Sequence, residues 1–152
     1  WRHGDWLEVT DRNTLIIKGR SDATLNRHGI RIGTAEIYQS VDKVKGIKDS
    51  LIVNLELDGG RHFMPLFVMM EEGATLSESL KDQINSQLTT DFSRRHVPDE
   101  IVEVKDIPYT ISGKKMEAPI KKILLGKSRH SAANLGAMRN PKSLLFFENY
   151  KF

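Results

Sequence analysis

Two polar stretches of the sequence carry side chains that bind phosphate or carboxylate groups. The first extends from Gly19-Arg20 to Arg31-Ile32-Gly33. Its arginines can hold a phosphate through paired hydrogen bonds, and its glycines let backbone approach a ligand. The second is PYTISGKK at residues 108–115, where a Ser-Gly pair presents Lys114, a compact charge suited to a phosphate or carboxylate oxygen. A charged surface turn and a solvated lysine at a helix start explain the same residues, so the patterns alone leave both interpretations open.

Several common kinds of active site are absent from the sequence. It contains no GxGxxG fingerprint after a predicted strand, no GxxxxGK[ST] phosphate loop and no GxSxG nucleophile motif. Cysteine is absent, which excludes a thiolate nucleophile and a cysteine zinc site and suits a reducing cytoplasm. The five histidines lack the spacing of a helical zinc site, so we expect no metal ligands in this sequence.

The elements that must position the two polar stretches are predicted from hydrophobic patterns. Residues 7–9 and 15–17 are β-prone runs on either side of turn formers at 11–13, which predicts an N-terminal hairpin. Residues 19–33, bracketed by glycines and rich in charge, are expected to form an exposed loop. The apolar tail residues 144–147 follow a stretch without periodicity, and we expect them to dock on the rest of the chain.

A small sheet is predicted from two further runs. Residues 51–57 and 62–70 flank a turn at 58–60, and Pro65, which has no amide proton, indicates an edge strand or a bulge. Another strand is expected over residues 101–104.

Three helices are predicted to pack on this sheet. Thr34 is a candidate N-cap of the first, and Thr75 with Glu78 forms a capping box for the second, whose apolar residues repeat every four positions as far as Phe92. A short helix is expected over residues 116–124. The prediction is an α+β fold, a small sheet with packed helices plus an N-terminal β-hairpin.

Length and charge limit the classes of protein further. The chain has 152 residues, which suits one compact domain, and no apolar run approaches the ~20 residues that span a bilayer, so we expect no membrane contact. Residues 1–100 carry 13 basic and 16 acidic side chains, whereas residues 101–152 carry 10 and 4. A basic C-terminal part attracts phosphate, but it lacks the clustered aromatics that stack on bases, so we expect no nucleic acid partner. The sequence begins Trp-Arg-His-Gly-Asp, and we expect it to be part of a longer chain.

Three motifs follow one another in a distinctive order. They are WRHGD at residues 1–5, GRSDATLNRHGIRIGTAEIY at 19–38 and PYTISGKK at 108–115. In this order they resemble the C-terminal domain of adenylate-forming acyl-CoA synthetases, and the resemblance covers residues 1–125. Finer features resemble the acetoacetate-activating members, namely RHVPDE at 95–100, SGKKMEAPIKKIL at 112–124 and a C-terminal extension over 126–152 that contains NPKSL.

The resemblance implies a two-step ligase of ketone-body and lipid metabolism. Acetoacetate and ATP would give acetoacetyl-AMP and pyrophosphate, and the thiol of CoA would then displace AMP. A larger N-terminal domain of the same chain would bind most of the ATP and Mg²⁺, so residues 1–152 alone are expected to be inactive. The alternatives are the lid domain of another short-chain synthetase, of the acetyl or propionyl type, and a non-catalytic binding module.

The resemblance also assigns roles to residues of the nucleotide site. Lys114 matches the adenylation lysine, which bridges the acyl carboxylate and the α-phosphate. Asp5 matches the residue that holds the ribose hydroxyls, Arg20 one that contacts ribose and phosphate, and Arg31 one associated with nucleotide phosphate.

Further matches concern the movement between the two steps. Asp22 matches the hinge about which the domain rotates, and the loop around Gly29 matches the wall of the pantetheine tunnel, where a side chain would obstruct CoA. We expect Lys115 to point away from Lys114, and its replacement by alanine to do little. Glu117 departs from the pattern, because many relatives carry arginine there.

Overall fold

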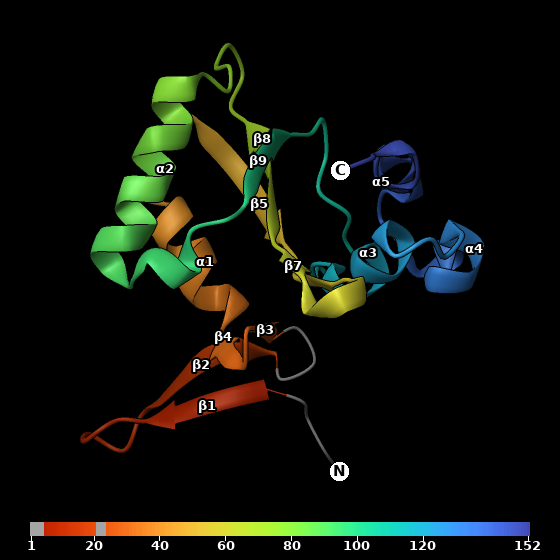
Figure 1. The fold of residues 1–152 in the computed structure, drawn as a ribbon. Helices are drawn as coiled ribbons and strands as arrows, with labels where there is room; N and C mark the ends of the chain where they lie inside the picture. The colour runs from red at the N-terminus through yellow and green to blue at the C-terminus, as the bar shows by residue number, and fades with distance from the viewer. Residues whose placement is uncertain (1–4, 21–23) are drawn as a thin grey trace.

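The computed structural model describes residues 5–20 and 24–152 as a mixture of short strands and helices (Figure 1). The strands are β1 (Asp5–Val9), β2 (Leu15–Arg20), β3 (Leu25–Arg27), β4 (Ile30–Ile32), β5 (Ile47–Ile52), β6 (Leu55–Glu56), β7 (His62–Phe63), β8 (Pro65–Met70) and β9 (Glu100–Glu103). The α-helices are α1 (Thr34–Val41), α2 (Glu78–Asp91), α3 (Glu117–Leu124), α4 (Arg129–Ala132) and α5 (Leu144–Asn149). The predicted α+β class is confirmed.

The centre of the fold is the three-stranded sheet β5-β8-β9, in which β8 pairs antiparallel with β5 and parallel with β9. Pro65 begins this central strand, so the edge-strand alternative is wrong, and the register shift of the β5–β8 ladder lies between Ile47 and Asp49 rather than at Pro65. Proline is tolerated there because it is the first residue of the strand. The hairpin ladder is interrupted just before it, where the backbone of Met64 pairs instead with Asp99.

Both faces of the central sheet are buried, and side chains alternate between them. Leu66 and Val68 of β8 pack with α1 and α2 on one face, whereas Phe67 between them points to the other. The first face is closed by Ile37 of α1 and Ile84 of α2, both fully buried. This sheet-and-helix layer gives α1 and β5 fixed positions from which side chains reach the candidate site.

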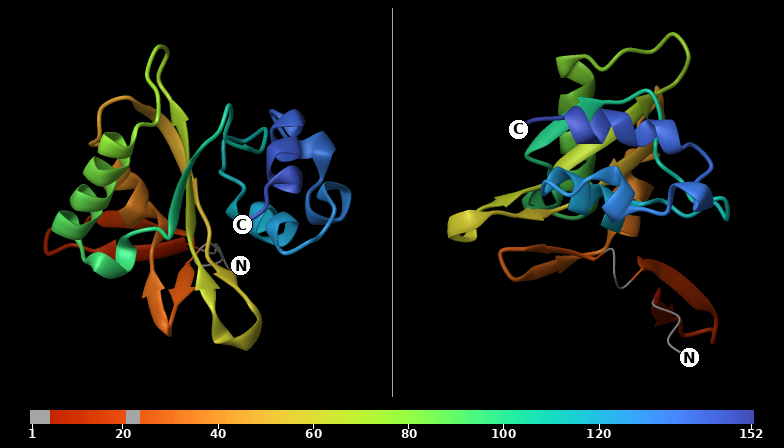
Figure 2. Two further views of the ribbon diagram at one scale, coloured as in Figure 1. Left: turned by 45° about the horizontal axis from the view of Figure 1, so that its top comes forward. Right: turned by 90° about the vertical axis from the view of Figure 1, so that its right-hand side faces the viewer.

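The opposite face is covered by α3 and the C-terminal tail, residues 126–152 (Figure 2). Leu144 and Phe147 of α5 are almost completely buried, and the ring of Phe147 meets that of Phe67 edge to face, with centroids 4.8 Å apart. The expected docking of the tail is therefore confirmed. The boundary near residue 125 stays a prediction, since residues on both sides of it share one core cluster.

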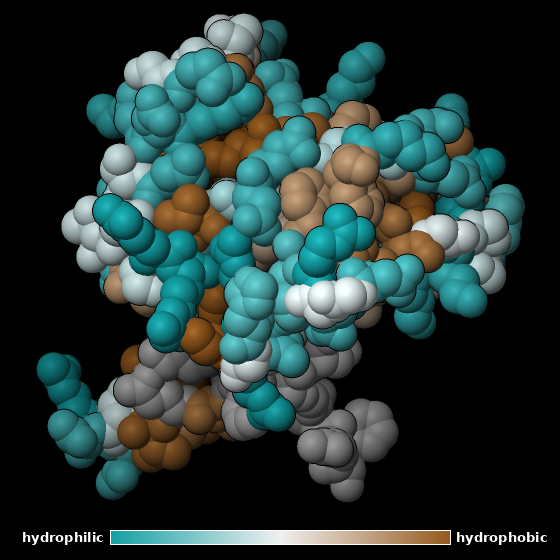
Figure 3. Space-filling model, viewed as in Figure 1, coloured by the Kyte–Doolittle hydropathy of each residue, from teal (hydrophilic) through white to brown (hydrophobic). Residues whose placement is uncertain are grey.

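Two hairpins precede this body. The predicted one, β1–β2, is confirmed, and apolar side chains gather on it at the lower left of Figure 3. Its exposed apolar residues are Leu7, Val9, Leu15 and Ile16. The exposed loop expected over residues 19–33 is wrong, because β2 continues to Arg20 and β3 and β4 pair as a second hairpin. His28 and Gly29 form the turn at its tip, and both have positive φ, as do the two central residues of a common type of tight hairpin turn.

The helix starts differ from those expected. Thr34 is the buried first residue of α1, and Gly33 is the N-cap without a side-chain bond. Helix α2 is capped by Ser77, whose hydroxyl accepts from the amide of Leu80, rather than by Thr75. In the described parts of the chain, no helix is long and apolar enough to cross a membrane.

Candidate active site

The Lys114 motif folds as a tight turn between Tyr109 and Lys115, which form an isolated antiparallel bridge. Within it the amide of Gly113 donates to the carbonyl of Thr110 at 2.9 Å, and the Thr110 hydroxyl accepts from the amide of Lys114 at 2.9 Å. Gly113 has a φ of +81°, a left-handed conformation that costs glycine little. Sequence and hydrogen bonding therefore give Lys114 a defined place at the end of a closed turn.

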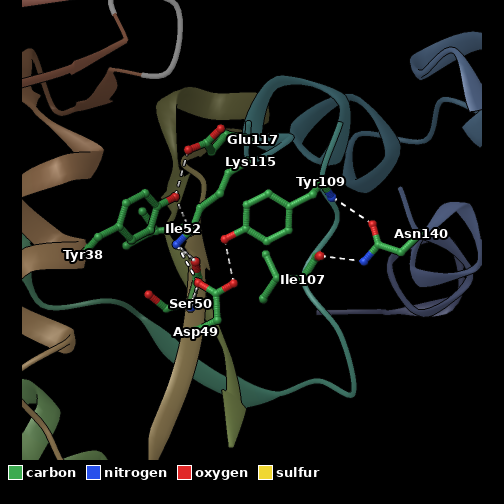
Figure 4. A network of polar contacts seen from close by, with 9 residues as sticks. All are labelled: Tyr38, Asp49, Ser50, Ile52, Ile107, Tyr109, Lys115, Glu117 and Asn140. Carbon is green, nitrogen blue, oxygen red and sulfur yellow. Dashed lines mark hydrogen bonds and ion pairs between the residues drawn. The ribbon is translucent and has the colours of Figure 1, made fainter. Parts of the chain in front are cut away.

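The two lysines of the motif face opposite ways. The side chain of Lys114 is exposed, and no described residue forms an ion pair with it. The ammonium of Lys115 points inward, 2.7 Å from Asp49 Oδ1 and 2.6 Å from the carbonyl oxygen of Ser50, to which it donates (Figure 4). It also lies 3.9 Å from the ring centroid of Tyr38. The expected divergence of the two side chains is confirmed.

Asp49 joins the turn to the central sheet. Its Oδ2 accepts a hydrogen bond of 2.7 Å from the hydroxyl of Tyr109, while its Oδ1 faces Lys115. Burial raises the pKa of Tyr109 well above its ordinary value, and the hydrogen bond to Asp49 raises it further. Tyr109 is therefore a neutral donor at physiological pH. The expectation that Lys115→Ala would do little to adenylation stays a prediction, and the contacts add that Asp49 would lose its cation in that variant.

Glu117, the departure from the family pattern, belongs to the same network. Its Oε1 accepts from the hydroxyl of Tyr38 at 3.0 Å, and that hydroxyl also accepts from the amide of Ile52 at 3.3 Å. Burial raises the pKa of Tyr38 well above its ordinary value, and the Glu117 charge adds to the shift. The network thus connects α1, β5, the turn and the start of α3.

The remaining candidate residues lie on the two hairpins. Asp5 and Arg20 are opposite each other in the β1–β2 ladder, so the register brings these two positions together. Arg31 is exposed on β4, and Gly29 has a φ of +81° with open space where a Cβ would lie. Asp22 lies outside the described residues.

Sequence reasoning missed Asp49, Tyr38 and Asn140, which surround the turn. Asn140 bonds to the backbone of the turn's first strand, and it stands in the NPKSL run of the tail. The one local signal for Asn140 in the sequence is its position before a proline in that run. Among residues 5–20 and 24–152, no group of three histidine or acidic side chains is arranged to hold a metal.

The fold identifies the class first. The structure of an anthranilate CoA ligase, AuaEII, in complex with anthranoyl-AMP superposes with a TM-score of 0.68 at 23% identity, covering 89% of this chain and 24% of that one. No protein-family model matches the chain. The arrangement of helices and small sheets matches the C-terminal domain of adenylate-forming enzymes.

Sequence similarity then narrows the class. The acetoacetyl-CoA synthetase of Caenorhabditis elegans is 45% identical over 99% of this chain. The structure of acetoacetyl-CoA synthetase from Streptomyces lividans matches 97% of the chain with a TM-score of 0.87 and 44% identity. The chain spans about a fifth of each, 21% and 22%. It is a homologue of the acetoacetyl-CoA synthetases and corresponds to the C-terminal part of these longer proteins.

Proposed function

We propose that this chain is the mobile C-terminal domain of an AMP-forming acetoacetate–CoA ligase and acts with a larger N-terminal domain of the same protein. In the first half-reaction, a carboxylate oxygen of acetoacetate attacks the α-phosphorus of ATP and pyrophosphate leaves. In the second, the sulfur of CoA attacks the acyl carbon and AMP leaves. The observation that carries the proposal is the braced turn that presents Lys114 outward.

Lys114 is proposed to act in the adenylation step. Negative charge accumulates on the oxygens around the α-phosphorus as the carboxylate attacks, and a cation already in place stabilises it without reorganisation. The closed turn holds the backbone of Lys114 in one position, and no described residue competes for its ammonium. These two features are what a catalytic lysine requires.

The hairpin residues are proposed to serve the nucleotide and CoA. The paired positions of Asp5 and Arg20 would let both residues contact one ribose, and exposed Arg31 suits a nucleotide phosphate. At Gly29 a pantetheine chain can approach the backbone, because no side chain projects and no described atom lies within 4 Å of a Cβ position. Asp22 is proposed as the hinge about which the domain rotates between the half-reactions. The rotation would withdraw Lys114 from the reacting groups and bring in the loop around Gly29.

Mg²⁺ belongs to the proposal as a partner of the ATP phosphates, where it would neutralise part of their charge. The described residues of this chain do not offer it a three-ligand site, so the ion is proposed to be held by the N-terminal domain. Cytoplasmic action is likewise proposed, because a chain without cysteine suits a reducing compartment.

The full-length protein provides the test. Acetoacetate should support ATP–pyrophosphate exchange and formation of acetoacetyl-CoA, with acetate and propionate as the competing substrates. The 152-residue chain alone should support neither half-reaction, because it supplies only some of the groups needed. Faster turnover of acetate or propionate would replace acetoacetate in the proposal, and robust turnover by the 152-residue chain would overturn its assignment as a lid domain.

A further inference from the structure

The C-terminal tail runs directly beside the strand that leads into the Lys114 turn. The amide of Ile111 donates to the carbonyl of Ala137 at 2.9 Å, and the amide of Arg139 donates to the carbonyl of Tyr109 at 3.0 Å. These two bonds flank an isolated antiparallel bridge between Thr110 of the turn and Met138 of the tail. The tail is therefore bonded to the turn's backbone as well as packed on the sheet.

Asn140 ends this contact and uses both polar atoms of its side chain in it. Its Oδ1 accepts from the amide of Tyr109 at 2.9 Å, while its Nδ2 donates to the carbonyl of Ile107 at 2.8 Å and to Asp106 Oδ2 at 2.6 Å. One side chain thus bonds three residues of the segment that enters the turn, and Figure 4 shows its bonds to two of them, Ile107 and Tyr109. A flipped amide would set a donor against the Tyr109 amide, so the partners fix its orientation.

The tail can act as a rigid support because it is itself anchored. Four residues after Asn140, Leu144 is fully buried, and Phe147 packs on Phe67 of the central strand. Tyr109 is consequently held at two points, with its backbone bonded to Asn140 and its hydroxyl to Asp49. Lys114 has no such anchor of its own, since its side chain is exposed.

We propose that Asn140 is a positioning residue for Lys114, through which the C-terminal tail fixes the turn for adenylation. This inference rests on the proposed function of Lys114. It adds a role for the 126–152 extension, which would otherwise serve only to cover the sheet. A displacement of about 1 Å in a catalytic group costs up to roughly 100-fold in rate, so a support for the turn's backbone matters to catalysis.

The test compares two asparagines of the tail in the full-length protein. Asn140→Ala removes the three bonds to the turn, whereas Asn149→Ala removes one bond within α5, from its Nδ2 to the carbonyl of Leu145. Asn140→Ala should lower kcat for acetoacetate-dependent pyrophosphate exchange roughly 10- to 100-fold, with a smaller change in KM for ATP. Thioester formation from supplied acetoacetyl-AMP should change less than about threefold, and Asn149→Ala should leave both half-reactions within about twofold.

A second pair of variants separates positioning from general damage. If Asn140 acts through Lys114, Asn140→Ala should have no further effect on adenylation in a Lys114→Ala background, because the two act as one unit. Additive losses, or equal slowing of both half-reactions by Asn140→Ala, would overturn the inference. Near-normal adenylation by Lys114→Ala would instead overturn the proposed role of Lys114 and the inference with it.

Hydrogen exchange gives a readout that does not depend on activity. Asn140→Ala should speed exchange of the Ile111 and Gly113 amides, which are bonded within or beside the turn, relative to Asn149→Ala. Exchange of the buried strand β8 should be the same in both variants. Unchanged exchange at the turn would contradict the inference even where the double variant is too slow to assay.

Discussion

The Lys114 turn has an outer face, on which Lys114 lies, and an inner face, on which Lys115 lies. Both faces carry a lysine, but the surroundings of the two side chains are opposite. On the outer face Lys114 is exposed and unpaired among the described residues. On the inner face Lys115 is 19% exposed, bonded to Asp49 and stacked on Tyr38. Because successive side chains of an extended segment point to opposite sides, one step along the chain separates a free cation from a structural one. The difference indicates that the inner lysine holds the turn, which would leave the outer one free for the proposed role in adenylation.

The largest expected effect comes from removing the outer cation. Lys114→Ala in the full-length protein should lower adenylation by about 10²- to 10³-fold, because a preorganised charge at the developing transition state is lost. Thioester formation from supplied acetoacetyl-AMP should be largely spared, and the melting temperature should not change, since the side chain is exposed. Lys127→Ala, another exposed lysine of the basic C-terminal part, is the control and should be silent in both assays.

Removing the inner cation should affect stability first. Lys115→Met keeps the apolar stem but leaves Asp49 without its ion pair and the Ser50 carbonyl without its donor. We expect a loss of roughly 2 kcal/mol in the free energy of unfolding, measured by urea denaturation of the 152-residue chain. Lys81→Met removes an exposed pair with Glu78 on α2 and should cost less than about 0.5 kcal/mol. Equal losses of unfolding free energy in the two variants would mean that the contacts of Lys115 contribute no more than an exposed ion pair.

The elements around these two lysines differ in how far sequence predicts them. The β5–β8 region, α2 and α3 were predicted because hydrophobic repeats are local. Hairpin β3–β4 was missed because its strands have three residues each and bury only Leu25 and Ile32 deeply, too few for a period to show. Phe92 was expected on the buried face of α2, but it lies at the end of the helix, 40% exposed, and stacks on His96. The four-residue hydrophobic repeat does not show where the helix ends, so it does not predict the exposure of Phe92.

The candidate site shows the same division. The Ser-Gly pair before the lysines is a local pattern that predicts a loop presenting Lys114, whereas the role of Lys114 follows only from the family resemblance. The residues that brace them come from α1, β5 and the tail, and Tyr38 and Glu117 are 79 positions apart. No spacing rule relates them, since their contact exists only after α1 and α3 have packed on β5. The sequence marks Glu117 as a departure from the family pattern, but only the fold identifies Tyr38 as its partner.

A smaller effect is expected at the link between the two faces. Tyr109→Phe keeps the ring that packs in the core but removes the hydroxyl that donates to Asp49 at 2.7 Å. One hydrogen bond to a carboxylate that keeps Lys115 as a partner should cost about 1 kcal/mol in unfolding free energy. Adenylation should fall less than in Lys114→Ala. A loss of adenylation as large as that of Lys114→Ala would assign Tyr109 to the chemistry and erase the distinction between the faces.

The effect that is smallest at physiological pH is a dependence of stability on pH, which appears only in alkaline solution. All three tyrosines of the chain, Tyr38, Tyr109 and Tyr150, have their pKa raised, each first by burial. A group whose folded pKa exceeds its unfolded value contributes fully below the unfolded pKa, about 10 for tyrosine. That contribution is lost as pH rises towards the folded pKa.

Unfolding free energy should therefore be insensitive to these groups below about pH 10 and fall above it, by at most about 1.4 kcal/mol per pH unit for each tyrosine. Tyr109→Phe should make that fall shallower by one tyrosine's share, as should Tyr150→Phe, which removes the bond from the tail to Glu100 of β9. Urea denaturation across this range, with phenolate absorbance recorded in parallel, measures both quantities. Of the three tyrosines, Tyr109 is the one that donates a hydrogen bond to Asp49, so its ionisation places a phenolate beside that carboxylate and weakens the support of the turn. Adenylation in the wild-type enzyme should consequently decline more steeply above pH 10 than in Tyr109→Phe. A steeper decline in Tyr109→Phe would show that the inner face does not transmit its protonation state to Lys114.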